Sequence, residues 1–223
     1  RTLATFHHQW LWGWFMSTDP DADVYDPANE IYYGPSLPLE TNRYAPYRLP
    51  DEAFCTAWRD KVLEVVDGYA PDAVYFDSRA NIIPSSFKEE VIRHYYERVP
   101  SGILTYKQAD FPEDAGVLDL ECGRFANSAG KPWQTDDRLE DQVTWCITQN
   151  PTYKSARRVL QQLADIVSKN GNLLLNVGPR ADGSIHPDAV RELTHIGDWL
   201  RQWGEAIYDT RPYSCFGEGP TKI

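Results

Sequence analysis

Residues 163–183, LADIVSKNGNLLLNVGPRADG, join a helix end, a turn, a strand and a second turn without spare residues. Apolar residues recur at helical spacing over 163–167, which predicts the last turns of a helix. The pair Asn170-Gly171 is then predicted to end the helix, because glycine tolerates the left-handed conformation of a C-cap. The unbroken apolar run 173–175 is typical of a parallel strand buried on both faces. Polar groups and glycines at 176–183 follow, at the strand end where α/β folds bind ligands.

The rest of the chain repeats this alternation of strand and helix. Strands are predicted at 1–8, 73–76, 102–106, 116–120 and 172–177, and helices at 51–69, 86–98, 153–168 and 187–203. Residues 19–50, rich in Asp, Pro and Tyr, are predicted to form a long ordered loop. The alternation indicates a parallel α/β sheet. A barrel is favoured over a doubly wound sheet, because no Gly-x-Gly-x-x-Gly follows a strand and candidate chemical residues end several strands.

The composition argues against several classes of function. The chain has 223 residues and a formal net charge of −11, which argues against a nucleic-acid partner but not against a neutral sugar. No apolar stretch is long enough to cross a membrane. The four cysteines contain no CxxC pair, which argues against a structural zinc site, and their wide spacing predicts no disulfide pairing. No signal peptide is visible, and the chain opens at Arg1 without an initiator Met.

The C-terminal third carries a family resemblance. The segment SKNGNLLLNVGPRADGSI at 168–185, followed by IGDWL at 196–200 and GEAIYDTRP at 204–212, resembles the C-terminal part of the catalytic domain of glycoside hydrolase family 29 α-L-fucosidases. The resemblance implies an α/β fold, a partial (β/α)8 TIM-type barrel of roughly strands 4–8 with the N-terminal strands missing. The fold would be an incomplete catalytic domain at 1–209, with 210–223 starting a linker toward an absent C-terminal β-sandwich domain.

Asp77 is the leading catalytic candidate. It ends the segment PDAVYFD, which resembles the family motif P-D-x-x-W-F-D, whose last Asp is the nucleophile. A retaining glycosidase needs such a carboxylate beside the anomeric carbon to form a covalent glycosyl ester. The alternative is an Asp that caps the following helix or turn.

Glu121 is the candidate general acid/base. It ends the segment VLDLE, and Asp119, two residues earlier on the same strand face, competes for the role. Some family members carry a Trp-Glu pair further on, where this chain has Trp133-Gln134, and an amide cannot exchange a proton in that way. For both acids, an ordinary surface or salt-bridge role is the alternative.

The resemblance also implies substrate contacts from His7, His8 and the nearby Trp12 at the end of the first strand. Two histidines at adjacent strand positions point to opposite faces, so at most one is expected in the site, and His8 is preferred. A metal site is not expected there, because no third ligand has suitable spacing.

Three further residues are implied as substrate contacts. Tyr75 stands where the family motif has Trp, and Lys107 follows the next strand, where a cation could lower the pKa of a carboxylate. Trp145 lies in the segment VTWC, which resembles a Ser-Trp-Gly-Tyr segment whose ring packs on the sugar's methyl group. Core packing for the aromatic residues and solvent exposure for the lysine are the alternatives.

The reaction implied by the resemblance is hydrolysis of terminal α-L-fucosides with retention, on a fucosylated glycan or glycoconjugate. It implies no metal or organic cofactor, and a secreted, periplasmic or lysosomal location. Two alternatives stay open: an inactive sugar-binding remnant, and a related retaining hydrolase for a sugar shaped like fucose. The 223-residue chain alone is expected to show little activity, and its oligomeric state is not predicted.

Overall fold

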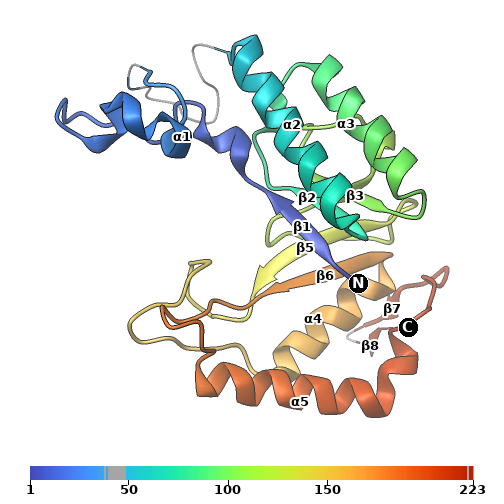
Figure 1. The fold of residues 1–223 in the computed structure, drawn as a ribbon. Helices are drawn as coiled ribbons and strands as arrows, with labels where there is room; N and C mark the ends of the chain where they lie inside the picture. The colour runs from blue at the N-terminus through green and yellow to red at the C-terminus, as the bar shows by residue number, and fades with distance from the viewer. Residues whose placement is uncertain (38, 40–48, 220, 223) are drawn as a thin grey trace. The chain divides into compact units, whose positions relative to one another are not determined.

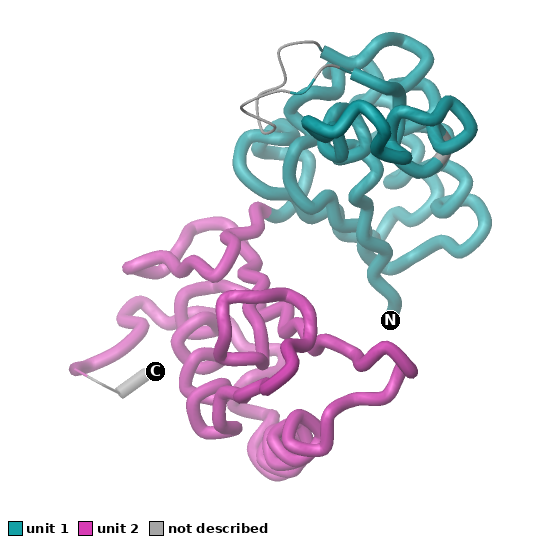
Figure 2. Tube along the Cα trace, turned by 90° about the vertical axis from the view of Figure 1, so that its left-hand side faces the viewer, with its two compact units in different colours: residues 1–117 teal, residues 118–223 magenta. Residues whose placement is uncertain are grey.

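The structure is a computed structural model that describes residues 1–37, 39, 49–219 and 221–222. The chain divides into two compact units, Arg1–Val117 and Leu118–Ile223 (Figure 2). Part of the predicted loop 19–50 lies outside the described residues, and the described part contains short helical turns. None of the described helices combines the length and the apolar character that a membrane span requires.

Unit 1 is built on a parallel sheet whose strands follow chain order (Figure 1). Its strands are β1 (Leu3–Phe6), β2 (Ala73–Phe76) and β3 (Ile103–Lys107), and its main helices are α2 (Glu52–Tyr69) and α3 (Ser85–Arg98), with a short α1 at Glu30–Tyr33. The register pairs Phe6 with Phe76 and Phe76 with Tyr106. The three strands therefore end side by side, as predicted for consecutive βα units.

Helix α2 shows why these residues fold as they do. The Asp51 side chain accepts a 2.9 Å hydrogen bond from the Phe54 backbone N–H and caps the first turn. Trp58, Val62 and Val66 recur at helical spacing and are fully buried. The helix then packs beside α3 (Figure 1), so one apolar stripe fixes its orientation on the sheet.

Unit 2 repeats the same construction. Its parallel strands are β4 (Val117–Asp119, starting at the last residue of unit 1), β5 (Trp133–Arg138) and β6 (Gly171–Asn176), its helices are α4 (Ala156–Ser168) and α5 (Pro187–Trp203), and β7 (Gly217–Glu218) pairs antiparallel with β8 (Thr221–Lys222). Leu139, Val159 and Ile196 form the centre of its apolar core. The α/β class and the predicted helices and strands are confirmed within a few residues at each end.

Two predictions about the opening segment need correction. The left-handed residue that ends α4 is Asn170, with φ of 71°, rather than Gly171. Gly171 is instead the first residue of β6, where an added Cβ would lie 2.5 Å from the Trp133 ring. The leucine run of β6 is only partly buried, because β6 pairs with β5 alone among the described strands. Strand β5 was not predicted.

The partial-barrel prediction is supported at a coarse level. Every described pairing among the six strands β1 to β6 is parallel and follows chain order, as in successive βα units. The numbering of these strands as roughly 4–8 of a barrel, and the domain boundary at 209, remain predictions.

Candidate active site

The carboxylate of Asp77 lies directly after β2, at the carboxyl end of the unit 1 sheet. Its backbone N–H donates to the Phe6 carbonyl at 3.3 Å, which extends the β1–β2 ladder by one residue. Val74 and Phe76 are fully buried and anchor the strand in the core. The Asp77 side chain is 26% exposed, so solvent or a ligand can reach an ionisable group on a rigid strand end.

An imidazole and an ammonium group, from the ends of the two neighbouring strands, contact this carboxylate. The His7 Nε2 lies 2.6 Å from Asp77 Oδ2, and the Lys107 Nζ lies 2.8 Å from Oδ1. Lys107 is buried, with its ammonium 5.8 Å from the centre of the Tyr75 ring. Burial alone would raise the pKa of Asp77, but the hydrogen bonds from His7 and Lys107 and the charge of Lys107 lower that pKa to about 2. The carboxylate is therefore ionised at neutral pH.

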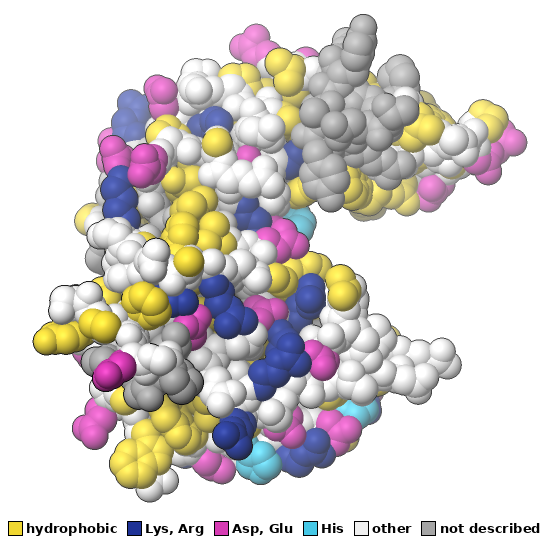
Figure 3. All heavy atoms as spheres, turned by 180° about the vertical axis from the view of Figure 1, so that it is seen from behind, with side chains coloured by type: hydrophobic (Ala, Val, Ile, Leu, Met, Phe, Trp, Pro, Cys, Tyr) yellow, Lys and Arg dark blue, Asp and Glu magenta, His cyan; other side chains and the backbone are white. Residues whose placement is uncertain are grey.

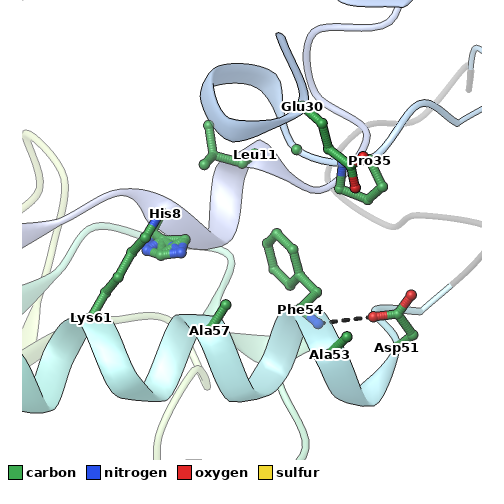
Figure 4. Close-up of a pocket in the computed structure, with 10 residues that line it drawn as sticks. His8, Leu11, Glu30, Pro35, Asp51, Ala53, Phe54, Ala57 and Lys61 are labelled. Atoms are coloured by element: carbon green, nitrogen blue, oxygen red, sulfur yellow. Dashed lines mark hydrogen bonds between the residues drawn. The ribbon is translucent and has the colours of Figure 1, made fainter. Parts of the chain in front are cut away.

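His8 faces away from Asp77, toward α2. Strand β1 ends at Phe6, so the two histidines lie on a short helical turn rather than on the strand. The His8 ring lies 5.9 Å from the Phe54 ring and lines a pocket of about 330 Å³ with Lys61 (Figure 4). Burial, followed by the charge of Lys61, lowers the pKa of His8 to about 4. Of the two histidines, the geometry favours His7, and not the preferred His8, as the partner of Asp77.

Two aromatic candidates are core residues in the structure. Trp12 is 1% exposed and its ring lies 5.0 Å from that of Phe54, so a sugar cannot reach it without repacking. Tyr75 is 3% exposed beneath Lys107, where it supports the ammonium. The burial of both rings favours the packing alternative over direct substrate contact.

The candidate acid/base residues lie in unit 2 and differ in exposure. Asp119, at the end of β4, is 2% exposed and accepts a 2.6 Å hydrogen bond from the Gln134 amide. Glu121 lies beyond the strand end and is exposed. The backbone N–H of Cys122, which follows it, bonds the Asp136 carbonyl at 2.9 Å and fixes the turn. Glu121 is thus accessible to solvent, whereas the Asp119 carboxylate is buried against Gln134 of β5.

Trp145 is half-buried in unit 2, with the Arg138 guanidinium 5.2 Å from its ring centre. Its carbonyl accepts a 3.0 Å hydrogen bond from the Asn176 side chain at the end of β6. Trp145 thus lies beside the end of β6, and its contact with the substrate stays a prediction. The structure brings Asp77, His7 and Lys107 together in unit 1, while Glu121 and Trp145 belong to unit 2.

Potential metal ligands, thiols and surface charges are the other chemical features of the described residues. Within the described ranges, no group of three or more His, Cys, Asp or Glu side chains is arranged to hold a metal ion. The four cysteines are free thiols. On the face shown in Figure 3, Lys and Arg side chains lie among acidic and apolar ones.

The supporting residues around Asp77 were not predicted. Gln9, Arg79 and Asp110 are almost completely buried, and their side chains bond the backbone of the segment after Asp77 or of the turn after β1. Nothing in their spacing distinguishes them from exposed polar residues, since each acts on a backbone atom distant in sequence.

Comparison with known proteins agrees with this geometry. Residues 4–205 match the family described as Alpha-L-fucosidase. Rat tissue alpha-L-fucosidase is 34% identical over 174 residues, covering 71% of this chain and 36% of the relative. Human plasma alpha-L-fucosidase is 41% identical over 76 residues, covering 33% of this chain and 16% of the relative.

A solved structure extends the likeness to three dimensions. The Thermotoga maritima alpha-fucosidase, in complex with a mechanism-based inhibitor, superposes with a TM-score of 0.64 and 28% identity, covering 74% of this chain and 38% of that one. The chain spans little more than a third of the length of either long match, rat or bacterial. Because the family match covers most of the chain, we conclude that this chain belongs to the alpha-L-fucosidase family of glycoside hydrolases.

Proposed function

We propose that this chain carries the nucleophile, and with it the acid/base residue, of an enzyme that hydrolyses terminal α-L-fucosides with retention. The observation that carries the proposal is the ionised Asp77 carboxylate, partly exposed at the end of β2 and held by His7 and Lys107. A carboxylate that stays charged and fixed suits attack on an anomeric carbon that develops positive charge.

In the first step, an Asp77 carboxylate oxygen attacks the anomeric carbon and forms a glycosyl ester. The bond from that carbon to the glycosidic oxygen breaks, and the leaving oxygen takes a proton from the Glu121 carboxylic acid. The aglycone departs as an alcohol, and Glu121 is left as a carboxylate. Lys107 and His7 hold Asp77 in place before the attack.

In the second step, water attacks the same carbon and gives its proton to the Glu121 carboxylate. The ester bond to Asp77 breaks, fucose is released with its original anomeric configuration, and Asp77 returns to its ionised form. The exposure of Glu121 supports this exchange with water, and the buried contact of Asp119 with Gln134 argues against Asp119 in the role.

The chain covers little more than a third of the length of its long matches, so the activity of a whole protein is itself a proposal. Among the described strands, β1 pairs only with β2 and β6 only with β5, which leaves a backbone edge open on each. An active site that lacks some of its substrate contacts stabilises the transition state less. We therefore expect little hydrolysis of an aryl α-L-fucoside by the 223-residue chain alone, and robust turnover by that chain would refute this part.

Rescue by azide tests the assignment of the two carboxylates. In the natural protein, Asp77→Gly should lose hydrolysis of an aryl α-L-fucoside, and added azide should restore turnover with β-L-fucosyl azide as product. Glu121→Gly should instead give α-L-fucosyl azide, because azide then attacks the glycosyl ester. Asp119→Asn is the matched control and should give no azide adduct.

The product stereochemistry decides each point separately. β-Azide from Asp77→Gly supports the nucleophile, and near-normal hydrolysis by that variant would overturn it. α-Azide from Asp119→Asn rather than from Glu121→Gly would transfer the acid/base role to Asp119. Faster turnover of an α-L-galactoside than of the fucoside would overturn the proposed sugar.

A further inference from the structure

The backbone immediately after Asp77 adopts an unusual conformation. Ser78 has φ of 59° and Arg79 has φ of 66°, so two successive residues other than glycine are left-handed. Both side chains are almost completely buried. Such conformations cost free energy and persist only where the surrounding structure holds them, so the contacts of this turn have to supply the restraint.

The Arg79 guanidinium supplies a large part of it. Its Nη1 donates to the carbonyls of Gln9 at 3.2 Å, Trp10 at 3.3 Å and Trp12 at 2.7 Å. The guanidinium carbon also lies 5.4 Å from the centre of the Trp10 ring. One buried cation thus binds the backbone of the turn that follows β1, which is the turn that His7 begins.

Hydrogen bonds also run in the opposite direction. The Trp10 indole N–H donates to the Asp77 carbonyl at 2.7 Å. The Gln9 side-chain amide donates to the Ser78 carbonyl at 2.7 Å, and Gln9 is fully buried. Residues 9–12 and 77–79 are therefore linked by bonds that each segment donates to the other.

The far side of the turn is fixed as well. The Asp110 carboxylate accepts hydrogen bonds from the backbone N–H groups of Ala80 at 3.0 Å and Asn81 at 3.1 Å. Asp110 itself is 1% exposed, and its carbonyl accepts from the Lys88 ammonium at 2.7 Å. Asp110 holds one side of the left-handed turn, and Arg79, Gln9 and Trp10 make the contacts between residues 77–79 and residues 9–12.

We propose that Arg79 is a positioning residue for the Asp77 nucleophile. It fixes the backbone on which Asp77 is mounted against the turn that carries His7, so that the carboxylate stays aligned for attack. The inference rests on the proposed function and extends it to a residue that touches no sugar. Because small displacements of a reacting group reduce rates strongly, the loss of Arg79 should lower turnover more than substrate binding.

Arginine suits this role better than lysine. The three carbonyls are all bonded by Nη1, one nitrogen of a rigid planar group, whereas a lysine ammonium is a compact point charge on a flexible stem. Arg79→Lys keeps the charge but loses the rigid planar group, and Arg79→Met keeps an unbranched apolar stem but loses all donors. The two variants separate the contribution of the charge from that of the hydrogen bonds.

The kinetic test uses both variants in the natural protein with an aryl α-L-fucoside. Arg79→Met should lower kcat by about 10- to 100-fold with KM within about twofold of wild type, and Arg79→Lys should fall between. Lys154→Met is the matched control, because Lys154 is a buried cation that also bonds a backbone carbonyl, that of Arg138 at 2.6 Å. Its kcat per folded molecule should stay unchanged. Unchanged kcat in Arg79→Met would overturn the proposal.

Hydrogen exchange measured by mass spectrometry gives a readout that needs no substrate. Arg79→Met should speed exchange in peptides covering 7–14 and 77–82, and Lys154→Met should not. Unaltered exchange in both peptides would overturn the proposal even if activity fell. If the wild-type protein does not hydrolyse the fucoside, the proposed function fails, and the exchange result alone then decides whether Arg79 holds the turn. Arg59→Met, at a more exposed ion pair with Glu90, serves as the control if Lys154→Met does not fold.

Discussion

Each unit contains one aspartate paired with a buried lysine, and the two pairs differ in how far the carboxylate is exposed. In unit 1, Asp77 lies 2.8 Å from the ammonium of the buried Lys107, and in unit 2, Asp137 lies 2.7 Å from that of the buried Lys154. Burial raises the pKa of each carboxyl, and its hydrogen-bonded lysine, with other donors, outweighs that effect and lowers it. By charge and pKa alone, the two pairs would be hard to tell apart.

The third partner distinguishes them. Asp77 has His7, whose side chain is 61% exposed, and Asp77 itself is 26% exposed. Asp137 has the Gln162 amide of α4 at 3.1 Å, and the Asp137 side chain is 13% exposed. One carboxylate is left open at a strand end, and the other is enclosed by a helix. If Asp77 is the nucleophile, as we propose, the feature that separates it from Asp137 is the side left open to a ligand, because the pKa of both carboxyls is lowered.

The two pairs should differ most in the effect on activity of replacing each carboxylate. In the natural protein, Asp77→Asn should lower kcat for an aryl α-L-fucoside by about four orders of magnitude or more, because no nucleophile remains. Asp137→Asn has the same change of shape and charge and should leave kcat per folded molecule within about twofold, with a lower melting temperature. Steady-state kinetics with mass spectrometry to detect deamidation measures both. Equal losses of activity would mean that the two pairs do not differ in function.

The enclosed pair should dominate stability. Lys154→Met leaves Asp137 charged and buried, which should cost about 3–5 kcal/mol of unfolding free energy in urea at pH 7. The control is Arg158→Met on the same helix, whose pair with Asp141 is about half exposed and should be worth less than about 1 kcal/mol. The folded-state pKa of Asp137 is lowered, so its contribution is present above the unfolded pKa of about 3.9 and disappears as pH falls further. Equal costs for the two variants would contradict this assignment.

The same contrast explains what the sequence could and could not predict. β6 was predicted from its leucine run, yet it is only partly buried, whereas the polar β5 is almost entirely buried and was missed. Gln134 and Asp137 are satisfied by Asp119 and Lys154, which lie 15 and 17 residues away. A hydrophobic pattern predicts strands with apolar side chains. A buried strand of polar and charged side chains can be predicted only when the partners of those side chains are known.

The site shows the same limit. Asp77 and Lys107 could be predicted because parallel strands in chain order bring their ends together. The preference for His8 over His7 assumed that both histidines lie on the strand, whereas β1 ends at Phe6 and it is His7 that contacts Asp77. Arg79 escaped notice because nothing local predicts two left-handed residues outside glycine.

The open pair should control the acid limb of the pH profile. His7 and Lys107 together lower the pKa of Asp77 to about 2, and Lys107→Met removes the hydrogen bond and the charge of the second of these partners. We expect the acid limb of kcat/KM to move upward from near pH 2, because the pKa of Asp77 rises when one of its two partners is lost, with turnover at the optimum reduced about tenfold. Lys107→Arg, which keeps the charge, should leave the limb close to its original position. A limb that does not move would show that Lys107 does not set the ionisation of Asp77.

The smallest effect should come from the third partners. His7→Leu removes the contact to Asp77 Oδ2 but leaves Lys107 in place, so we expect kcat to fall about three- to tenfold, the size of one net hydrogen bond. His7→Gln can still donate from its amide and should lie nearer wild type. Gln162→Leu is the counterpart at Asp137 and should lower the melting temperature with kcat unchanged, because its amide faces an enclosed carboxylate. If His7→Leu instead lowered only stability and Gln162→Leu lowered only turnover, the exposure of the carboxylate would not explain the difference between the two pairs.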